Sequence, residues 1–276
     1  METTHNISGG GDLELSVHEW GNPNGAPILF IHGYSQSHLS WTAQYASPLT
    51  EEFRLVAFDL RGHGESEKPL EARNYTDGSL WADDVTAVIE TLSLDRPVLV
   101  GWSYGGFVMC DYLKRHGQAA IAGLNFVAAA VRLNPSFEML GPGFLENAKG
   151  TMSSDLATRI KSTQKFVRAC TAKPLSTNDF SAIVAFNMVV PVEVKLGMVS
   201  RELNFDTVLA GLSVPVLVTH GREDSVVLPA MSEHIVATVP RAEKSFYDGI
   251  GHASFLEDPE RFNRELATFV GRARAG

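Results

Sequence analysis

The sequence predicts an α/β fold in which helices flank a doubly wound, mostly parallel sheet. Its apolar runs are rich in β-branched residues and are continuous rather than alternating, which is typical of strands buried on both faces. Segments of helical periodicity separate several of these runs. This alternation of strand-like and helix-like segments is interrupted at residues 131–212. The interruption predicts one helical insertion in a single scaffold.

The first element expected is an antiparallel hairpin. Leu13, Leu15 and Val17 alternate with polar residues, and they follow the turn Gly9-Gly10-Gly11-Asp12. Alternation with a period of two indicates a strand with one buried and one exposed face. We therefore expect this hairpin to be half exposed.

The scaffold continues with buried strands and the helices between them. The expected strands are 28–31, 55–58, 98–100, 124–130 and 216–218. Apolar residues recur at helical spacing in 81–92, 107–112 and 229–239. These segments predict a core domain made of residues 1–130 and 213–276.

Residues 131–212 have weak strand signals and helical patches such as 154–169. We interpret them as a helical cap, inserted after the sixth strand and lying over the functional site. The alternative is that these helices continue the scaffold.

The chain has 23 basic and 32 acidic residues, a net charge of −9, and no basic run. This charge argues against nucleic acid and anionic membranes as partners. Its two cysteines, Cys110 and Cys170, are expected to be buried and unpaired, as in a reducing compartment. The N-terminus lacks signal-peptide features and the most apolar run, 121–131, is too short to span a bilayer, so we expect a cytoplasmic protein.

The motif Gly101-Trp102-Ser103-Tyr104-Gly105 lies between the strand 98–100 and the helix that begins near Phe107. A serine at a sharp strand-to-helix turn is typical of a nucleophile elbow. Glycines are needed there because the turn strains the serine backbone and side chains at 101 or 105 would collide. Ser103 is therefore the predicted nucleophile.

A serine hydroxyl needs a base, and after such an elbow the chain supplies an acid and then a histidine. Of the late histidines, His234 lies within a helical stretch, whereas His252 follows the loop Asp248-Gly249-Ile250-Gly251 after a strand. We predict His252 as the base, because catalytic residues of open α/β sheets lie in loops at strand ends.

The acid should orient the histidine and stabilise its charged form. Asp224 follows the strand 216–218 at a distance that lets it reach the histidine loop. Glu223 in the same turn is the rival, and a helix-capping role for Asp224 is a further alternative. The preceding strand ends in residues 128–132 without a carboxylate, which favours Asp224.

An oxyanion hole requires two backbone N–H groups. Tyr104 follows the nucleophile, and Tyr34 follows His32-Gly33 after the first buried strand. Gly33 would allow a close approach of the backbone. We expect His32 to brace this loop by hydrogen bonding.

Five motifs in order resemble the α/β-hydrolase superfamily over nearly the whole chain: His32-Gly33, residues 59–66, Gly101 to Gly106, Gly221 to Asp224, and Gly251-His252. The resemblance implies a mostly parallel eight-stranded sheet with a helical cap, and a structural role for residues 59–66, including His63. It is closest to capped microbial carboxylesterases. Neighbouring groups are lactonases, cofactor-free haloperoxidase or perhydrolase-like enzymes, and C–C bond hydrolases.

Other members of the superfamily fit less well. Haloalkane dehalogenases and epoxide hydrolases use an aspartate where this chain has Ser103, and Ser35 stands where epoxide hydrolases often have proline. Large lipases tend to be longer and to carry a secretion signal.

We therefore expect a serine carboxylesterase that hydrolyses small to medium esters through an acyl-enzyme, without metal or cofactor. The expected partner is a small-molecule ester, and the expected assembly is a monomer or homodimer. The alternatives are a lactonase, perhydrolase or C–C bond hydrolase with the same triad, or a receptor-like, ligand-binding member of the fold. The expected substrate pocket is apolar: Trp102, Phe137, Met139, Leu140, Phe144, Phe186, Met188, Val189, Val226 and Val227. The alternative for each cap residue is packing within the cap.

Overall fold

The computed structural model describes residues 2–133 and 137–275. Its centre is an eight-stranded sheet in the order β1-β2-β4-β3-β5-β6-β9-β10. The six strands from β4 to β10 in this order are parallel, while β2 pairs antiparallel with both β1 and β4. The strands are β1 (Thr3–Ser8), β2 (Glu14–Gly21), β3 (Ala26–Ile31), β4 (Phe53–Phe58), β5 (Val98–Trp102), β6 (Gly123–Val127), β9 (Val216–Gly221) and β10 (Glu243–Tyr247). The predicted fold class is confirmed.

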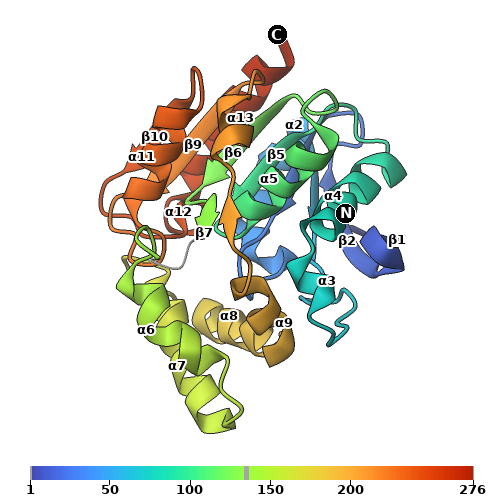
Figure 1. Cartoon of the computed structure of the whole chain (residues 1–276). Helices are drawn as coiled ribbons and strands as arrows, with labels where there is room; N and C mark the ends of the chain where they lie inside the picture. The colour runs from blue at the N-terminus through green and yellow to red at the C-terminus, as the bar shows by residue number, and fades with distance from the viewer. Residues whose placement is uncertain (1, 134–136, 276) are drawn as a thin grey trace.

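Helices cover both faces of this sheet and extend beyond one end of it (Figure 1). Two 3₁₀ helices lie early in the chain, η1 (Gly10–Asp12) and η2 (His38–Trp41). The scaffold helices are α1 (Thr42–Tyr45), α2 (Leu49–Glu52), α3 (Arg73–Thr76), α4 (Gly78–Thr91), α5 (Gly105–His116), α10 (Asp206–Ala210), α11 (Pro229–Thr238), α12 (Ser254–Glu257) and α13 (Pro259–Ala275).

The helical cap follows β6 and consists of α6 (Pro142–Thr151), α7 (Leu156–Ala169), α8 (Thr177–Val189) and α9 (Val192–Val199). Its two ends are joined by a short antiparallel ribbon, β7 (Arg132–Leu133) and β8 (Leu203–Asn204). α10, inside the expected 131–212 insertion, makes its main contacts with α5 and α11 of the scaffold. The cap lies at the lower end of the sheet in Figure 1.

Each central strand is buried on both faces. In β3, Ile28 and Phe30 join one apolar cluster, whereas Leu29 and Ile31 join the other. Because successive side chains of a strand point to opposite faces, a continuous apolar run is what such a strand requires. α13 covers the first face, and α4 and α5 cover the second.

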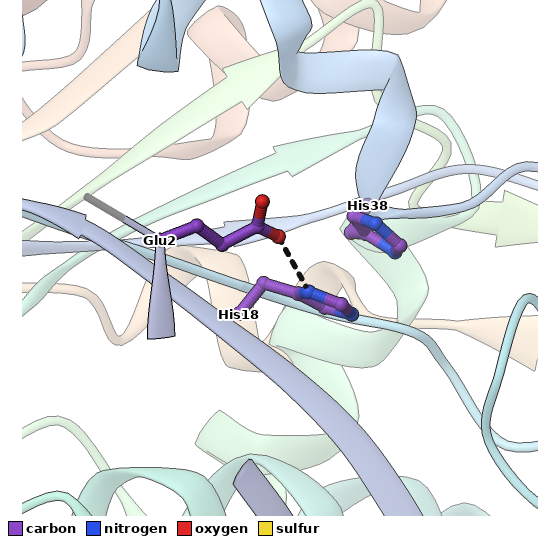
Figure 2. A group of neighbouring side chains, drawn as sticks. All are labelled: Glu2, His18 and His38. Carbon is purple, nitrogen blue, oxygen red and sulfur yellow. Dashed lines mark hydrogen bonds and ion pairs between the residues drawn. The ribbon is translucent and has the colours of Figure 1, made fainter. Parts of the chain in front are cut away.

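The N-terminal hairpin departs from its expected exposure. β1 and β2 pair antiparallel as expected, but Ser16 and His18 are buried although they lie on the face expected to be exposed. The Glu2 carboxylate lies 3.0 Å from His18 Nδ1, and the His38 ring stacks on His18 with centroids 3.5 Å apart (Figure 2). The N-terminal segment and the loop after β3 thus cover that face, which local alternation does not reveal.

The strand expected at 124–130 is shorter than predicted. β6 ends at Val127, and Ala128 has φ 42°. The Ala130 N–H donates to the carbonyl of Ser103 at 2.9 Å. These apolar residues therefore leave the sheet to support the neighbouring turn.

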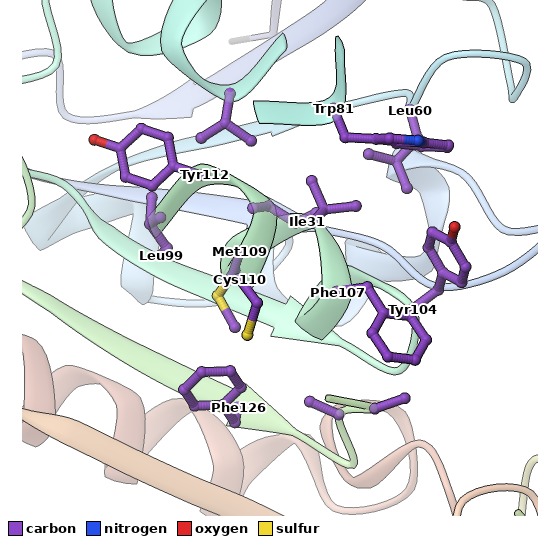
Figure 3. Packing of buried hydrophobic residues seen from close by; sticks show 14 of the residues in the cluster. Ile31, Leu60, Trp81, Leu99, Tyr104, Phe107, Met109, Cys110, Tyr112 and Phe126 are labelled. Atoms are coloured by element: carbon purple, nitrogen blue, oxygen red, sulfur yellow. The ribbon is translucent and has the colours of Figure 1, made fainter. Parts of the chain in front are cut away.

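The face covered by α4 and α5 carries a dense aromatic and aliphatic core (Figure 3). Tyr104 lies there beside Phe107, with ring centroids 5.2 Å apart, and 5.6 Å from Trp81. The residue after the predicted nucleophile is therefore anchored in the scaffold.

None of the described helices is by itself long and apolar enough to cross a membrane. α8 and α9, bent by 84° at their junction, reach the required length and apolar content only together.

Candidate active site

Ser103 occupies the turn between β5 and α5 and has a φ of 54°. A non-glycine residue in this region is strained, and such strain persists only where surrounding contacts hold it. The Ser103 N–H donates to the Val127 carbonyl at 3.0 Å, and its carbonyl accepts from Gly106 at 3.0 Å. The strand-turn-helix geometry predicted for this motif is present.

The glycines around Ser103 are required by close packing. A Cβ on Gly105 would collide with the carbonyl oxygen of Ile31, and one on Gly101 would collide with the Met109 side chain. The turn can therefore fit between β3 and α5 only without side chains at these two positions.

His252 and Asp224 are paired and buried in the loops after β10 and β9. His252 Nδ1 lies 2.7 Å from Asp224 Oδ2. The backbone also fixes the histidine, since Trp102 Nε1 donates to the His252 carbonyl at 2.9 Å. With Nδ1–H donated to a carboxylate, Nε2 is the unprotonated nitrogen available to a substrate or nucleophile.

Asp224 is held as a carboxylate. Burial opposes its ionisation, but the nearby His252 and His220 outweigh burial and lower the pKa of Asp224 to about 2. Its Oδ1 accepts from the N–H groups of Val226 and Val227 at 2.7 and 3.0 Å. Several donors on one buried carboxylate both fix its direction and favour its charge.

The rival candidates lie elsewhere. Glu223 is exposed, although it occupies the same turn as buried Asp224. His234 Nε2 is hydrogen-bonded to Asp206 Oδ1 at 2.7 Å, away from the His252–Asp224 pair. The structure thus brings together His252 and Asp224 and leaves Glu223 and His234 outside their contact.

His220 is part of this cluster, a position that was not predicted from the sequence. Its Nε2 lies 2.9 Å from Asp224 Oδ2, the oxygen that also contacts His252. The Ser232 hydroxyl donates to its Nδ1 at 2.6 Å. The available signal was a polar residue at the end of an apolar strand, four positions before the acid.

The loop after β3 passes close to Ser103. A Cβ on Gly33 would lie 2.9 Å from Ser103 Cβ and 3.5 Å from Oγ. Within residues 2–133 and 137–275, neither the Tyr34 nor the Tyr104 backbone N–H donates a hydrogen bond. Two unengaged amides flanking the nucleophile can bind a negative oxygen.

His32 and His63 brace this loop from beneath. His32 Nε2 accepts from the Leu60 N–H at 3.0 Å, and His63 Nε2 accepts from the Ser35 N–H at 3.2 Å. Their Nδ1–H groups donate to the Gly33 and Arg61 carbonyls. Burial lowers the pKa of His32 to about 4 and that of His63 to about 3, so both rings are neutral supports.

An apolar cavity of about 40 Å³ lies beside Ser103. Four residues expected in the pocket line it: Leu140, Phe144, Val226 and Val227. The rest of the lining, which was not predicted from the sequence, consists of Ser103 and the side chains of Tyr34, Tyr104, Phe107, Ala130, Leu133, Phe166 and Val199. The Tyr34 ring meets Phe144 and Phe166 edge-on, with centroids 5.7 and 6.2 Å apart.

The other six expected pocket residues do not line this cavity. Trp102 is buried below His252, and Phe137 lines an outer groove of the cap. Met139 packs against the scaffold core. On α8, Phe186 is buried, Met188 is half-buried and Val189 is 52% exposed.

Glu2, His18 and His38 are the one set of metal-ligating side chains that the described residues bring within 4.8 Å of one another. His18 uses both ring nitrogens, toward Glu2 and Ser16, and His38 Nδ1 contacts Asp59 at 3.0 Å. The two rings are stacked, 16° from parallel, so their lone pairs do not converge on one point (Figure 2). We interpret the group as a hydrogen-bonded stack.

Comparison with known proteins identifies the family of the fold. A family model described as the alpha/beta hydrolase fold matches residues 26–259. The bifunctional esterase/perhydrolase DCH of Acinetobacter calcoaceticus is 28% identical over 272 residues, covering 94% of this chain and 96% of that protein.

Two solved structures are similar along almost their full length. One is a putative aryl esterase from Burkholderia cenocepacia, with 36% identity, a TM-score of 0.94, and coverage of 99% of this chain and 100% of that one. The other is an esterase from Rhodococcus sp. ECU1013, with 33% identity, a TM-score of 0.92, and coverage of 97% and 98%.

Proposed function

The chain belongs to the α/β-hydrolase family, and from that premise we propose that it is a serine carboxylesterase that cleaves small to medium esters through an acyl-enzyme. One observation carries the proposal. Trp102, the residue before the strained Ser103, donates to the carbonyl of His252, whose ring is paired with buried Asp224 at 2.7 Å, and two unengaged amides and an apolar cavity adjoin Ser103. These are the groups that acyl transfer to serine requires.

Acylation uses Ser103 as nucleophile, His252 first as base and then as acid, and the two amides as oxyanion donors. His252 Nε2 takes the Ser103 hydroxyl proton while Oγ attacks the ester carbonyl carbon. The carbonyl oxygen becomes an oxyanion between the N–H groups of Tyr34 and Tyr104, which contribute about 3 kcal/mol each to the transition state. His252 then protonates the leaving alcohol as the C–O bond breaks, and the acyl group remains on Ser103.

Deacylation repeats the sequence with water as nucleophile. His252 takes a proton from water, the hydroxide attacks the acyl carbon, and Ser103 leaves with the proton. Asp224, ionised at any working pH, stabilises the imidazolium in both halves.

The cavity beside Ser103 suits the acyl half of the ester. It is lined by both tyrosines of the oxyanion site but not by His252, which must reach the leaving alcohol. The alcohol therefore departs on the histidine side, and the acyl group occupies the apolar side.

Perhydrolysis is a second candidate. The acyl-enzyme would then be attacked by hydrogen peroxide instead of water, giving a peracid. The observation that favours it is the similarity to a protein named bifunctional esterase/perhydrolase.

The test is pre-steady-state turnover of p-nitrophenyl acetate. We expect a burst of one p-nitrophenol per active site, and a fall in kcat of at least about 10⁴-fold in Ser103→Ala. Unchanged turnover in Ser103→Ala would overturn the assignment of Ser103 as the nucleophile. Binding of the ester by the wild-type protein without turnover would favour a receptor-like protein. Adding peroxide to the same assay and measuring peracid distinguishes the second candidate.

We also propose the cytoplasm as its location and a monomer or homodimer as its assembly. The location is supported by Cys110 and Cys170, which are both buried and unpaired.

A further inference from the structure

The cavity beside Ser103 is too small for more than a short acyl group. Its volume of about 40 Å³ corresponds to roughly three water-sized positions. Aromatic rings of Tyr34, Phe144 and Phe166 enclose it with edge-on contacts. A longer acyl chain must leave this cavity by another route.

A second apolar space begins where the cavity ends. A groove of about 770 Å³ runs over the cap between α6, the start of α7, and α9. Phe144 and Val199 line both the inner cavity and this groove. The two spaces therefore share a wall, which the side chains of Phe144 and Val199 form.

The groove exposes large apolar side chains. Leu145 is 45% exposed and Leu196 is 49% exposed, and both line it. Contiguous exposed apolar surface on a folded domain marks a binding site, because burying it gains about 25 cal/mol per Å². Two neighbouring leucines on different helices form such a surface here.

The charges at the groove favour a neutral occupant. Among the described residues that line it, Glu146 and Lys149, one acidic and one basic, are the only Asp, Glu, Lys or Arg side chains. A site for an anionic headgroup would need several cations, and none adjoins Lys149 in this lining. An uncharged hydrocarbon chain matches this surface, and the shared wall places the groove next to the cavity that Ser103 lines.

We propose that this cap groove, defined by Leu145, Leu196 and the shared residues Phe144 and Val199, binds the distal part of a linear acyl chain whose carbonyl is at Ser103. The inference rests on the proposed esterase function and names its substrate class as esters of medium-chain linear acids. The first few carbons occupy the inner cavity, and the remainder lies along α6 and α9.

The experiment compares kcat/KM for p-nitrophenyl acetate, butyrate, octanoate and decanoate. In the wild-type protein, we expect decanoate to be cleaved at least as efficiently as butyrate. In Leu196→Gln and Leu145→Gln, we expect the decanoate-to-acetate ratio of kcat/KM to fall about tenfold, because the chain loses apolar contact. Leu70→Gln is the matched control: Leu70 is 57% exposed and does not line the groove, so the ratio should not change.

Binding provides a readout that does not depend on turnover. In Ser103→Ala, decanoate binding measured by calorimetry should weaken about tenfold when Leu196→Gln is added and not when Leu70→Gln is added. If no ester is cleaved but this difference in binding is measured, the proposed esterase function is wrong, whereas the assignment of the groove as an acyl-chain site is supported.

Three results would overturn the groove assignment. One is a kcat/KM that falls steadily from acetate to decanoate, with no effect of either leucine variant. Another is a change in sedimentation of Leu196→Gln with an unchanged chain-length profile, which would make the groove an interface between two copies. The third is loss of binding to phosphatidylcholine vesicles with the same unchanged profile, which would make it a lipid-facing surface.

Discussion

The surroundings of Asp224 distinguish it from its neighbour Glu223 as the candidate acid. Glu223 precedes it in the same turn and carries the same functional group, yet Glu223 is exposed and Asp224 is buried. Only Asp224 has a histidine on one oxygen and two backbone N–H groups on the other. Burial and hydrogen bonding, rather than residue type, make it the candidate acid.

We predict that Asp224→Asn lowers kcat for p-nitrophenyl acetate by about 10³- to 10⁴-fold. The amide cannot stabilise an imidazolium, and it favours the wrong tautomer of His252. Glu223→Gln is the matched control and should stay within about twofold of the wild-type kcat. Comparable losses in both variants would contradict the assignment of the acid.

His220 adds a second histidine to the same carboxylate oxygen. It is fully buried, and its Nε2 is also 3.0 Å from the Val227 carbonyl. Because the carboxylate accepts from both rings, Asp224 is fixed in the direction that His252 requires. This positioning contact joins the end of β9 to the loop after it, and Asp224 in turn contacts His252 in the loop after β10.

At the scale of elements, the oxyanion loop and the nucleophile turn fit together through glycine. Gly33 brings the loop after β3 against Ser103, and the neutral rings of His32 and His63 hold that loop from below. The position of the Tyr34 amide therefore depends on a backbone approach that a side chain would block.

We predict that Gly33→Ala lowers kcat by about 10- to 100-fold, since a displacement near 1 Å at a catalytic donor can cost about 100-fold. The measurement is kcat for p-nitrophenyl acetate, with circular dichroism to verify folding. Gly211→Ala is the control, because the nearest atoms to its added Cβ lie at an ordinary 3.6 Å. An unchanged kcat in Gly33→Ala would remove Tyr34 from the oxyanion site.

The cap is tied to the scaffold close to the same site. Arg201, just after α9, contacts both carboxylate oxygens of Asp111 on α5 at 2.7 and 2.8 Å. The Tyr104 hydroxyl donates to the Met198 carbonyl at 3.3 Å. One residue, Tyr104, thus carries an amide of the proposed oxyanion site and contacts the cap with its side chain.

For the whole molecule, buried neutral histidines make stability depend on pH. Unfolded histidines bind a proton near pH 6.5, whereas burial lowers the pKa of His32 to about 4 and of His63 to about 3. Between these values the unfolded chain binds more protons, so stability falls as the pH falls below 6.5. Burial raises the pKa of Asp111 to about 6 despite Arg201, and this acts in the opposite direction.

We predict that the free energy of unfolding falls by roughly 3 kcal/mol between pH 7.5 and pH 5. On going from pH 7.5 to pH 5, His32 and His63 each lower the free energy of unfolding by about 2 kcal/mol, and Asp111 raises it by about 1 kcal/mol. Urea unfolding at the two pH values measures the change. His63→Gln should show a smaller loss, and a midpoint that stays level or rises on acidification would contradict the prediction.

The sequence by itself determined the fold class and proposed the three candidate catalytic residues. Continuous apolar runs and a glycine-flanked serine are local signals, because strand burial and turn sterics act on neighbouring residues. The order of acid and histidine along the chain then left only a few candidates for each role.

The tertiary structure decided what depends on contacts between distant segments. Such contacts bury the second face of β2 and bring His220 to Asp224. They also determine which side chains of the cap line the cavity. α8 carries apolar residues on several sides, so periodicity did not indicate its inward face, and Phe186, Met188 and Val189 lie outside the cavity. Packing between helices, which no local pattern encodes, sets the shape of the acyl site.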